Sequence, residues 1–257
     1  MKYLIIPILC AVVFASCDPA TAFNVNEATL PTNLEMPAYT ADEDIYTYSG
    51  FTSSYNHTTL VPNWVAYELT ADELNGNYDS KSSSFSRDPN VRGRQASRED
   101  YSRSGWDKGH MAPKADLRWS ETAYWESHYF TNVCPQNHQM NAGDWNTLEK
   151  SVRRWARKYG TLWIVCGPVF DEHRFGTIGA AKVQVPDAFF KAVLMRDAGG
   201  FHSVAFVMPN TPEHHPMSAY VCTVDDLEAL IGRDLFPNLP DAVESQAEST
   251  YQQPLWF

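Results

Sequence analysis

Four short runs of β-branched and aromatic residues are bounded by glycine, proline or polar residues. They cover residues 64–69, 162–166, 189–195 and 203–208. Such runs are typical of strands, because these side chains pack well on a pleated surface. The runs do not alternate regularly with helical patterns. We therefore predict an α+β protein rather than a doubly wound parallel sheet.

Two further segments have the spacing of amphipathic helices. Residues 141–159 carry apolar side chains three and four positions apart, and Gly160 closes the segment. The apolar positions are Trp145, Leu148, Val152, Trp155, Ala156 and Tyr159. A shorter helix is predicted over residues 224–231, with Thr223 as its N-cap and Gly232 just past its end. The stretch 72–104 is polar and interrupted by Gly, Pro and Ser, which predicts a long loop.

The N-terminal part predicts export. Residues 1–17 combine a lysine, an apolar stretch too short to span a bilayer, and small residues before Cys17, which is the pattern of a secretory signal. Cys17 suits lipidation of a membrane-anchored lipoprotein at the periplasmic or cell surface, whereas cleavage after residues 20–22 would give a secreted protein. Residues 18–50 are rich in Asp, Glu, Thr, Pro and Ala, so we predict a flexible acidic tether and a catalytic domain over 51–257.

The positions of the cysteines and histidines raise the possibility of a disulfide or of a zinc site. Beyond the signal, Cys134, Cys166 and Cys222 allow at most one disulfide, and the sequence does not say which two would pair. Cys134 with His138, or the pair His214–His215, could suggest zinc. Neither has the paired spacing of a structural zinc site.

The net charge of −11 argues against an anionic partner until its distribution is considered. Residues 81–158 contain 14 Lys or Arg against 9 Asp or Glu. A basic segment inside an acidic chain indicates a face that attracts a polyanion such as DNA or RNA. A solvated charged surface is the alternative.

The candidate catalytic residues belong to the motif Asp107-Lys108-Gly109-His110, which is followed by Asn141 and Glu149. A neutral imidazole such as His110 can act as a general base, which contributes about 10² to 10⁴ in rate. Enzymes typically need about 10⁶-fold or more, so most of the acceleration must come from elsewhere. We expect a hydrated Mg²⁺ or Mn²⁺, because it stabilises charge on phosphate oxygens and takes few protein ligands.

Asn141 offers an amide oxygen to such an ion, and no tight carboxylate cluster accompanies it, so one metal is expected. Glu149 lies eight residues further along the predicted helix and could hold a water of the ion. Alternatively, Glu149 pairs with Arg153 at i+4.

These residues resemble the signature of the DNA/RNA non-specific endonuclease family, the ββα-metal nucleases. The resemblance extends over about residues 51–240. The matching segments are residues 64–67, 85–88, 100–101, 118–120, 132–136, 141, 145, 148–149 and 166–168. It implies a mostly antiparallel central sheet flanked by helices.

The resemblance also implies roles for individual residues. His110 would be the general base, Asn141 the single direct ligand of Mg²⁺, and Glu149 the holder of the ion's water, while Asn132 and Gln136 would organise the site. Two departures stand out. Lys108 replaces the arginine of the signature, and the arginine expected near Ser83 is absent. Its substitute would be Arg87, Arg94 or Arg98.

We therefore predict an exported endonuclease that hydrolyses phosphodiester bonds of DNA and RNA. His110, Glu149 and Asn132 are its catalytic candidates and Asn141 its metal ligand. The substrate-binding candidates are Lys108, Arg118, Gln136 and Arg153. Two other functions stay open: a catalytically weak or silent nucleic-acid-binding module, and a scaffold lipoprotein of the same fold.

Overall fold

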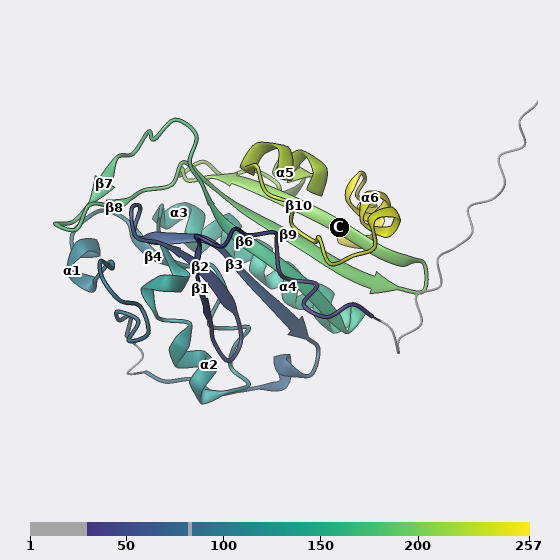
Figure 1. Cartoon of the computed structure of the whole chain (residues 1–257), viewed down its shortest axis with the longest axis horizontal. Coiled ribbons are helices and arrows are strands. Elements are labelled where there is room, and N and C mark those ends of the chain that lie inside the picture. Colours follow the sequence, from purple (N-terminus) through teal and green to yellow (C-terminus); the bar gives the residue numbers. More distant parts are fainter. Residues whose placement is uncertain (1–29, 82–83) are drawn as a thin grey trace, which may run out of the picture.

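The computed structural model describes residues 30–81 and 84–257, and in this part of the chain a seven-stranded antiparallel sheet forms the centre (Figure 1). The strand order is β1-β2-β3-β6-β9-β10-β11. These strands are β1 (Asp44–Thr47), β2 (Thr52–Asn56), β3 (Val61–Thr70), β6 (Thr161–Val169), β9 (Ala188–Asp197), β10 (Gly200–Pro209) and β11 (Val221–Cys222). The predicted α+β class and antiparallel sheet are confirmed.

The four predicted strands are the central ones, β3, β6, β9 and β10. Their sequences are almost continuously apolar because both faces of the sheet are covered. In β3, Val65 and Tyr67 belong to one hydrophobic core, whereas Trp64 and Ala66 belong to the other. The period of two along a strand thus separates two cores within one domain.

One face of the sheet is covered by α4 (Asn146–Tyr159). Its residues Leu148, Val152 and Trp155 are buried there. The same face carries a small hairpin, β4 (Asp107–His110) with β5 (Val133–Gln136). Shorter helices on the chain are α1 (Arg98–Tyr101), α2 (Glu121–Glu126), α3 (His138–Met140) and α7 (Gln253–Trp256), with 3₁₀ turns at Glu73–Asn75, Phe130–Asn132 and Met217–Ala219. The predicted helix over 141–159 is confirmed, except that its first turn, Asn141–Trp145, is π-helical.

The other face is covered by α5 (Val224–Ile231) and α6 (Asp241–Glu248), which pack on β10 (Figure 1). The limits of α5 agree with the prediction. Thr223 Oγ1 accepts a hydrogen bond from Asp226 N at 3.0 Å, and Gly232 ends the helix in the left-handed conformation. A further two-stranded ribbon, β7 (Thr177–Ile178) with β8 (Val183–Gln184), lies in the β6–β9 connection.

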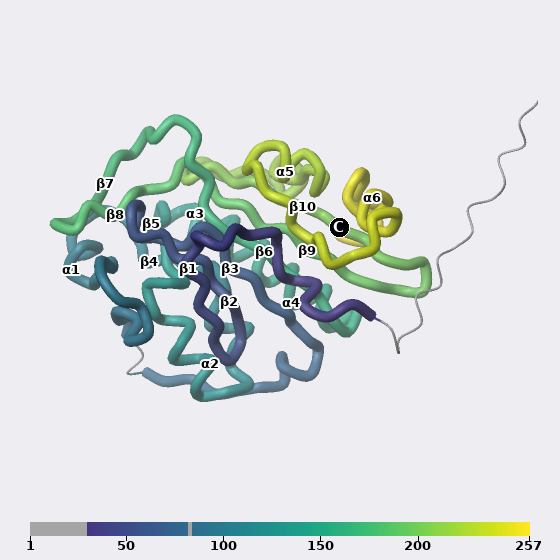
Figure 2. The backbone as a smooth tube through the Cα atoms, in the orientation of Figure 1, coloured from purple at the N-terminus to yellow at the C-terminus, as the bar shows by residue number. Residues whose placement is uncertain are grey.

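The predicted tether over residues 18–50 is wrong for the described residues from 30 onward. Leu34 is fully buried in the second core, and β1 pairs with β2. Glu43 accepts hydrogen bonds from Trp64 Nε1 and from Arg233. Acidic composition indicated solvation, but Glu43 has one buried and one charged partner. The N-terminal segment therefore runs across the domain beside the loop after α5 (Figure 2), and the domain begins before residue 51.

Other sequence-based expectations have mixed outcomes. In the described residues of 72–104, the helical elements are α1 and a 3₁₀ turn, as expected from the polar composition of this loop. Cys134, Cys166 and Cys222 are all free thiols. The predicted signal peptide, residues 1–17, lies outside the described residues.

Candidate active site

The signature residues form β4, which pairs antiparallel with β5. Asp107 lies opposite Gln136, and His110 lies opposite Val133. Gly109 is required by a close approach: a Cβ at this position would overlap with the side chain of Gln136. The hairpin therefore brings residues 107–110 next to the start of the helical segment that follows β5.

Gln136 is fully buried beneath β4, and its amide atoms have no hydrogen-bond partner among the described residues. It was predicted to bind substrate, but an enclosed side chain cannot contact a phosphate directly. Its packing against Gly109 instead supports the strand that carries the signature.

Asn132 is also fully buried and fixes the chain that leaves β4. Its Oδ1 accepts a hydrogen bond from Ala112 N at 2.8 Å, and its Nδ2 donates to Ala112 O and Ser127 O. The Asn132 carbonyl oxygen accepts from Met111 N. Asn132 was predicted as catalytic, but these contacts make it a positioning residue for the segment after His110.

His110 ends β4 with its ring packed between two aromatic side chains. The ring centroids of Phe85 and His128 lie 4.9 and 5.2 Å from that of His110. Its Nε2 is enclosed and has no partner in the described part of the chain. Burial, together with His128 and Lys114, lowers the pKa of His110 to about 3, so the imidazole is neutral at neutral pH and can accept a proton.

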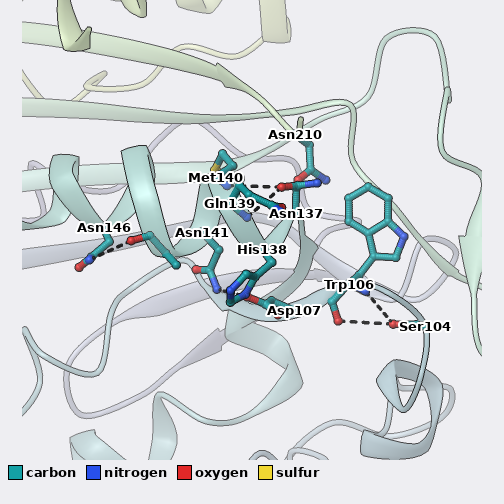
Figure 3. Close-up of polar contacts among 11 residues, drawn as sticks. Ser104, Trp106, Asp107, Asn137, His138, Gln139, Met140, Asn141, Asn146 and Asn210 are labelled. Carbon is teal, nitrogen blue, oxygen red and sulfur yellow. Dashed lines mark hydrogen bonds and ion pairs between the residues drawn. The ribbon is translucent and has the colours of Figure 1, made fainter. Parts of the chain in front are cut away.

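Asn141 lies at the beginning of the π-helical turn, beside the other end of β4. Its Nδ2 donates to Asp107 Oδ2 at 2.9 Å, and His138 Nδ1 lies 2.8 Å from the same oxygen (Figure 3). A carboxylate only accepts hydrogen bonds, so the amide nitrogen must face Asp107. The Asn141 amide oxygen is therefore directed away from Asp107 and is available to a hard cation such as Mg²⁺.

The start of this helical segment is anchored by two further asparagines (Figure 3). Asn137 Oδ1 accepts from Gln139 N at 3.0 Å and caps α3. Asn137 N donates to Asn210 Oδ1 at 2.7 Å, and the buried Asn210 also donates to Pro135 O. Asn141 thus projects from a segment whose backbone is fixed by Asn210, the residue that follows β10.

Glu149 lies eight residues after Asn141 on α4, where it is partly exposed and has the buried Asp116 and Lys191 as charged neighbours. Burial raises its pKa to about 7, with Asp116 acting in the same direction and Lys191 opposing it. Lys191 is fully buried; its Nζ donates to Met111 O at 3.2 Å and lies over the ring of Trp145. Because Met111 follows His110 in the chain, Lys191 connects the region of Glu149 to the end of β4.

Arg153 was predicted to contact phosphate, and the structure places it elsewhere. Its guanidinium donates to Asp116 Oδ1 at 2.7 Å, and the Arg153 side chain is 15% exposed. Tyr67 OH also donates to Asp116, at 3.1 Å. Arg153 therefore neutralises a buried carboxylate, and the alternative i+4 ion pair between Glu149 and Arg153 is not formed.

The remaining basic candidates have different surroundings. Arg118 donates to the carbonyl oxygens of Tyr78 and Asn77, so it holds the preceding loop and is only partly free for substrate. Lys108 lies over the rings of Phe85 and Tyr101.

Three arginines were candidates to replace the missing one near Ser83. Arg98 donates to Ser84 Oγ at 3.0 Å, next to that position. Arg94 donates to Ala181 O, and Arg87 is exposed. Ser83 itself lies outside the described residues.

Three positions that shape the site were given no role from the sequence, although Asp107 belongs to the quoted signature. Asp107 orients Asn141, Asp116 binds Arg153, and Lys191 joins the buried charges. One signal was present: Lys191 interrupts an apolar strand sequence, where an unpaired lysine would be costly.

Comparison with known proteins places these residues in a family. The family model described as DNA/RNA non-specific endonuclease matches residues 31–242. A mitochondrial EXOG nuclease of Xenopus laevis is 35% identical over 207 residues, which cover 75% of this chain and 58% of that protein. Human mitochondrial endonuclease G is 32% identical, covering 72% of this chain and 67% of that protein. The chain thus spans little more than half the length of the Xenopus relative.

A solved structure shares the fold. A crystal structure of the EndoG/EndoGI complex, which concerns the mechanism of EndoG inhibition, matches with a TM-score of 0.74 and 27% identity. The match covers 80% of this chain and 91% of that chain.

The predicted location as an exported, lipid-anchored or secreted protein is contradicted by these comparisons. The relatives from frog, human and yeast are named as mitochondrial nucleases. None of the helices within residues 30–81 and 84–257 has the length and apolar character needed to cross a bilayer.

Proposed function

Because the chain belongs to the DNA/RNA non-specific endonuclease family, we propose that it hydrolyses phosphodiester bonds in DNA and RNA, using one divalent cation and His110 as general base. One observation carries this proposal. A single hairpin holds the Asn141 amide at its Asp107 end and the unpartnered Nε2 of His110 at its other end.

The side chains present fit a hydrated Mg²⁺ or Mn²⁺. The oriented amide oxygen of Asn141 would hold the ion directly, and Glu149, with no hydrogen-bond partner among the described residues, would hold one of its waters. When bound, the cation offsets the negative charge that develops on the phosphate oxygens. Few protein ligands are needed, since Mg²⁺ keeps most of its hydration shell.

His110 takes the proton from the attacking water at Nε2. In the free protein its low pKa ensures that Nε2 carries a lone pair at neutral pH. A phosphodiester beside the ring favours the imidazolium, because an opposite charge raises the pKa of a histidine. Substrate binding therefore makes His110 a stronger base when it is needed.

Nucleic acid is held by the basic side chains around the hairpin. Lys108 takes the position of the signature arginine, Arg87 lies in the loop before α1, and Arg98 is the first residue of α1. Lys108 keeps the charge of an arginine but loses the planar fork that binds phosphate with two hydrogen bonds. We expect weaker phosphate positioning than an arginine would give, with cleavage retained.

The test compares cleavage of plasmid DNA and of RNA in Mg²⁺ by the wild-type protein and three variants. His110→Ala and Asn141→Ala should each reduce the rate by about 10² or more, the contribution of a general base or of charge stabilisation. His57→Ala serves as a matched control, because His57 forms an ion pair with Asp44 on the surface. Cleavage by His110→Ala at the wild-type rate would remove the assigned base. Binding without cleavage by the wild-type protein would favour the silent nucleic-acid-binding module instead.

A further inference from the structure

A depression of about 420 Å³ lies between α5 and α6. These two helices cover the face of the sheet opposite to α4 (Figure 1). Most of its lining residues are acidic. They are Asp225, Glu228, Gly232, Arg233, Asp234, Asp241, Glu244, Ser245 and Glu248. The depression takes no part in the chemistry described above, and its α6 half lies largely beyond residue 242, where the family match ends.

Three of these carboxylates converge. One oxygen each from Asp225, Glu228 and Glu248 lies within 4.8 Å of the other two. Asp225 and Glu228 come from the same face of α5, three residues apart, and Glu248 comes from the last turn of α6. Two helices that are joined by a loop thus direct acidic groups toward one point.

Glu248 gives an independent indication of a missing partner. Its side chain is 4% exposed, and its Oε1 is enclosed without a hydrogen-bond partner in the described chain. A buried carboxylate is costly unless it is paired or coordinates a metal. A surface cluster of acids in water would not carry this cost.

Nearby cations do not supply the compensation. Arg233 is the one basic residue among those that line the depression. Its guanidinium lies 3.0 Å from Glu43 Oε1 and also donates to Ala38 O, so it is engaged away from the three carboxylates. Glu228 Oε1 accepts from Leu235 N at 2.7 Å, which leaves its second oxygen for a ligand.

We propose that Asp225, Glu228 and Glu248 bind a Ca²⁺ ion that joins α5 to α6. Ca²⁺ takes six to eight oxygen ligands at about 2.3–2.6 Å, so oxygens on opposite sides of the ion lie up to about 5 Å apart. The spacing of these three carboxylates fits that shell, and waters complete it. Mg²⁺ requires a smaller, regular octahedron and prefers fewer carboxylates. The site stabilises the C-terminal helices and is separate from the Asn141 centre.

The experiment titrates CaCl₂ into the full chain by isothermal titration calorimetry and follows thermal unfolding in parallel. The variants are Glu248→Gln, Asp225→Asn and Asn141→Ala. Asp226→Asn is the matched control, because Asp226 is exposed on the same helix and does not line the depression. We expect one Ca²⁺ site in the wild-type, Asn141→Ala and Asp226→Asn proteins, with unfolding midpoints raised by several degrees. Glu248→Gln and Asp225→Asn should bind Ca²⁺ at least tenfold more weakly.

Three outcomes would overturn the site: no Ca²⁺ binding by the wild-type protein, unchanged binding by both Glu248→Gln and Asp225→Asn, or equal loss in Asp226→Asn. Asp225 is exposed, so its variant reports on the site even if Glu248→Gln folds poorly. Cleavage of DNA in Mg²⁺ should be unchanged in Asp225→Asn, which separates this proposal from the proposed nuclease function.

Discussion

Two groups of carboxylates lie on opposite faces of the same sheet, and their charged neighbours differ. On the α4 face, Asp116 and Glu149 have Arg153 and Lys191 as neighbours. On the α5–α6 face, the charged groups that shift the pKa of Glu248 are other carboxylates, because Arg233 pairs with Glu43. Burial is the first cause of a raised pKa in both groups, and it brings Glu149 to about 7 and Glu248 to about 9.

The difference shows what the neighbours contribute. Lys191 and Arg153 oppose the effect of burial on Glu149, whereas Glu228 and Glu244 add to it on Glu248. The cations beside Glu149 therefore offset part of the cost of its negative charge. Glu248 lacks this offset, so at neutral pH it favours a proton or, as proposed above, an external cation.

The largest effect is expected from removing the built-in cation of the first group. Lys191→Met leaves Glu149 and Asp116 with one cation fewer, and breaking a buried ion network in this way costs about 3–5 kcal/mol. Urea unfolding measures this loss. Lys150→Met on α4 is the control, because Lys150 is exposed and should change stability by less than about 0.5 kcal/mol. Equal stability of the two variants would mean that Lys191 compensates nothing.

Gly109→Ala tests the support of the catalytic face without touching a charge. The added methyl group would overlap with the buried Gln136, so β4 or β5 must shift. Overpacking of this kind costs about 1–3 kcal/mol, and displacement of His110 should lower the cleavage rate by about 10². Gly143→Ala is the control, since a Cβ there meets nothing within 4 Å. Full activity in Gly109→Ala would show that the hairpin tolerates a looser fit.

The sequence predicted the strands and helices whose own residues carry the whole signal, such as an apolar run or a pair of helix caps. The central strands are continuously apolar because both faces are buried, and α5 carries its own N-cap and terminating glycine. The strand β1, with sequence Asp-Ile-Tyr-Thr, was missed because it is a short edge strand whose side chains are not fully buried. Its partner β2 follows after a short turn but has the largely polar sequence Thr-Ser-Ser-Tyr-Asn, so the local pattern did not predict a strand pair and composition indicated a tether.

In the candidate site, the sequence indicated those residues whose side-chain chemistry alone suggests a role. His110 and Asn141 are brought to one hairpin, and Glu149 follows on α4. Arg153 was misassigned because its partner Asp116 lies 37 residues away in the chain, and nothing local indicates that pair. Gln136 and Asn132 were assigned contacts with the reaction, whereas burial makes them supports of the backbone.

The pH dependence of stability separates the two groups further. Glu149 has a folded pKa of about 7 against an ordinary value of 4.5, so the folded state keeps its proton longer as the pH rises. Stability therefore falls between about pH 4.5 and pH 7, by on the order of 1–3 kcal/mol in metal-free protein. Glu149→Gln should make the fall between pH 5 and pH 8 smaller in urea unfolding, while Glu248, whose folded pKa is also raised, contributes equally in both proteins. Added Mg²⁺ should reduce it in the wild-type protein, because a cation favours the ionised carboxylate. An identical pH profile in both proteins would contradict the assignment.

The smallest effect is expected from single basic residues on the two faces. Binding of nucleic acid to the α4 face should release counterions, so each phosphate contact adds about 0.9 to the slope of log affinity against log salt for duplex DNA. Lys108→Ala should therefore reduce that slope by about 1 and weaken binding of all sequences alike.

Arg233→Ala removes the same charge from the opposite face, where Arg233 binds Glu43, and should leave the slope unchanged. Fluorescence anisotropy of a labelled duplex without Mg²⁺, in the Asn141→Ala background, measures both slopes without cleavage. Equal changes would indicate that the long-range field of the whole acidic protein, rather than contact at the β4 hairpin, controls binding.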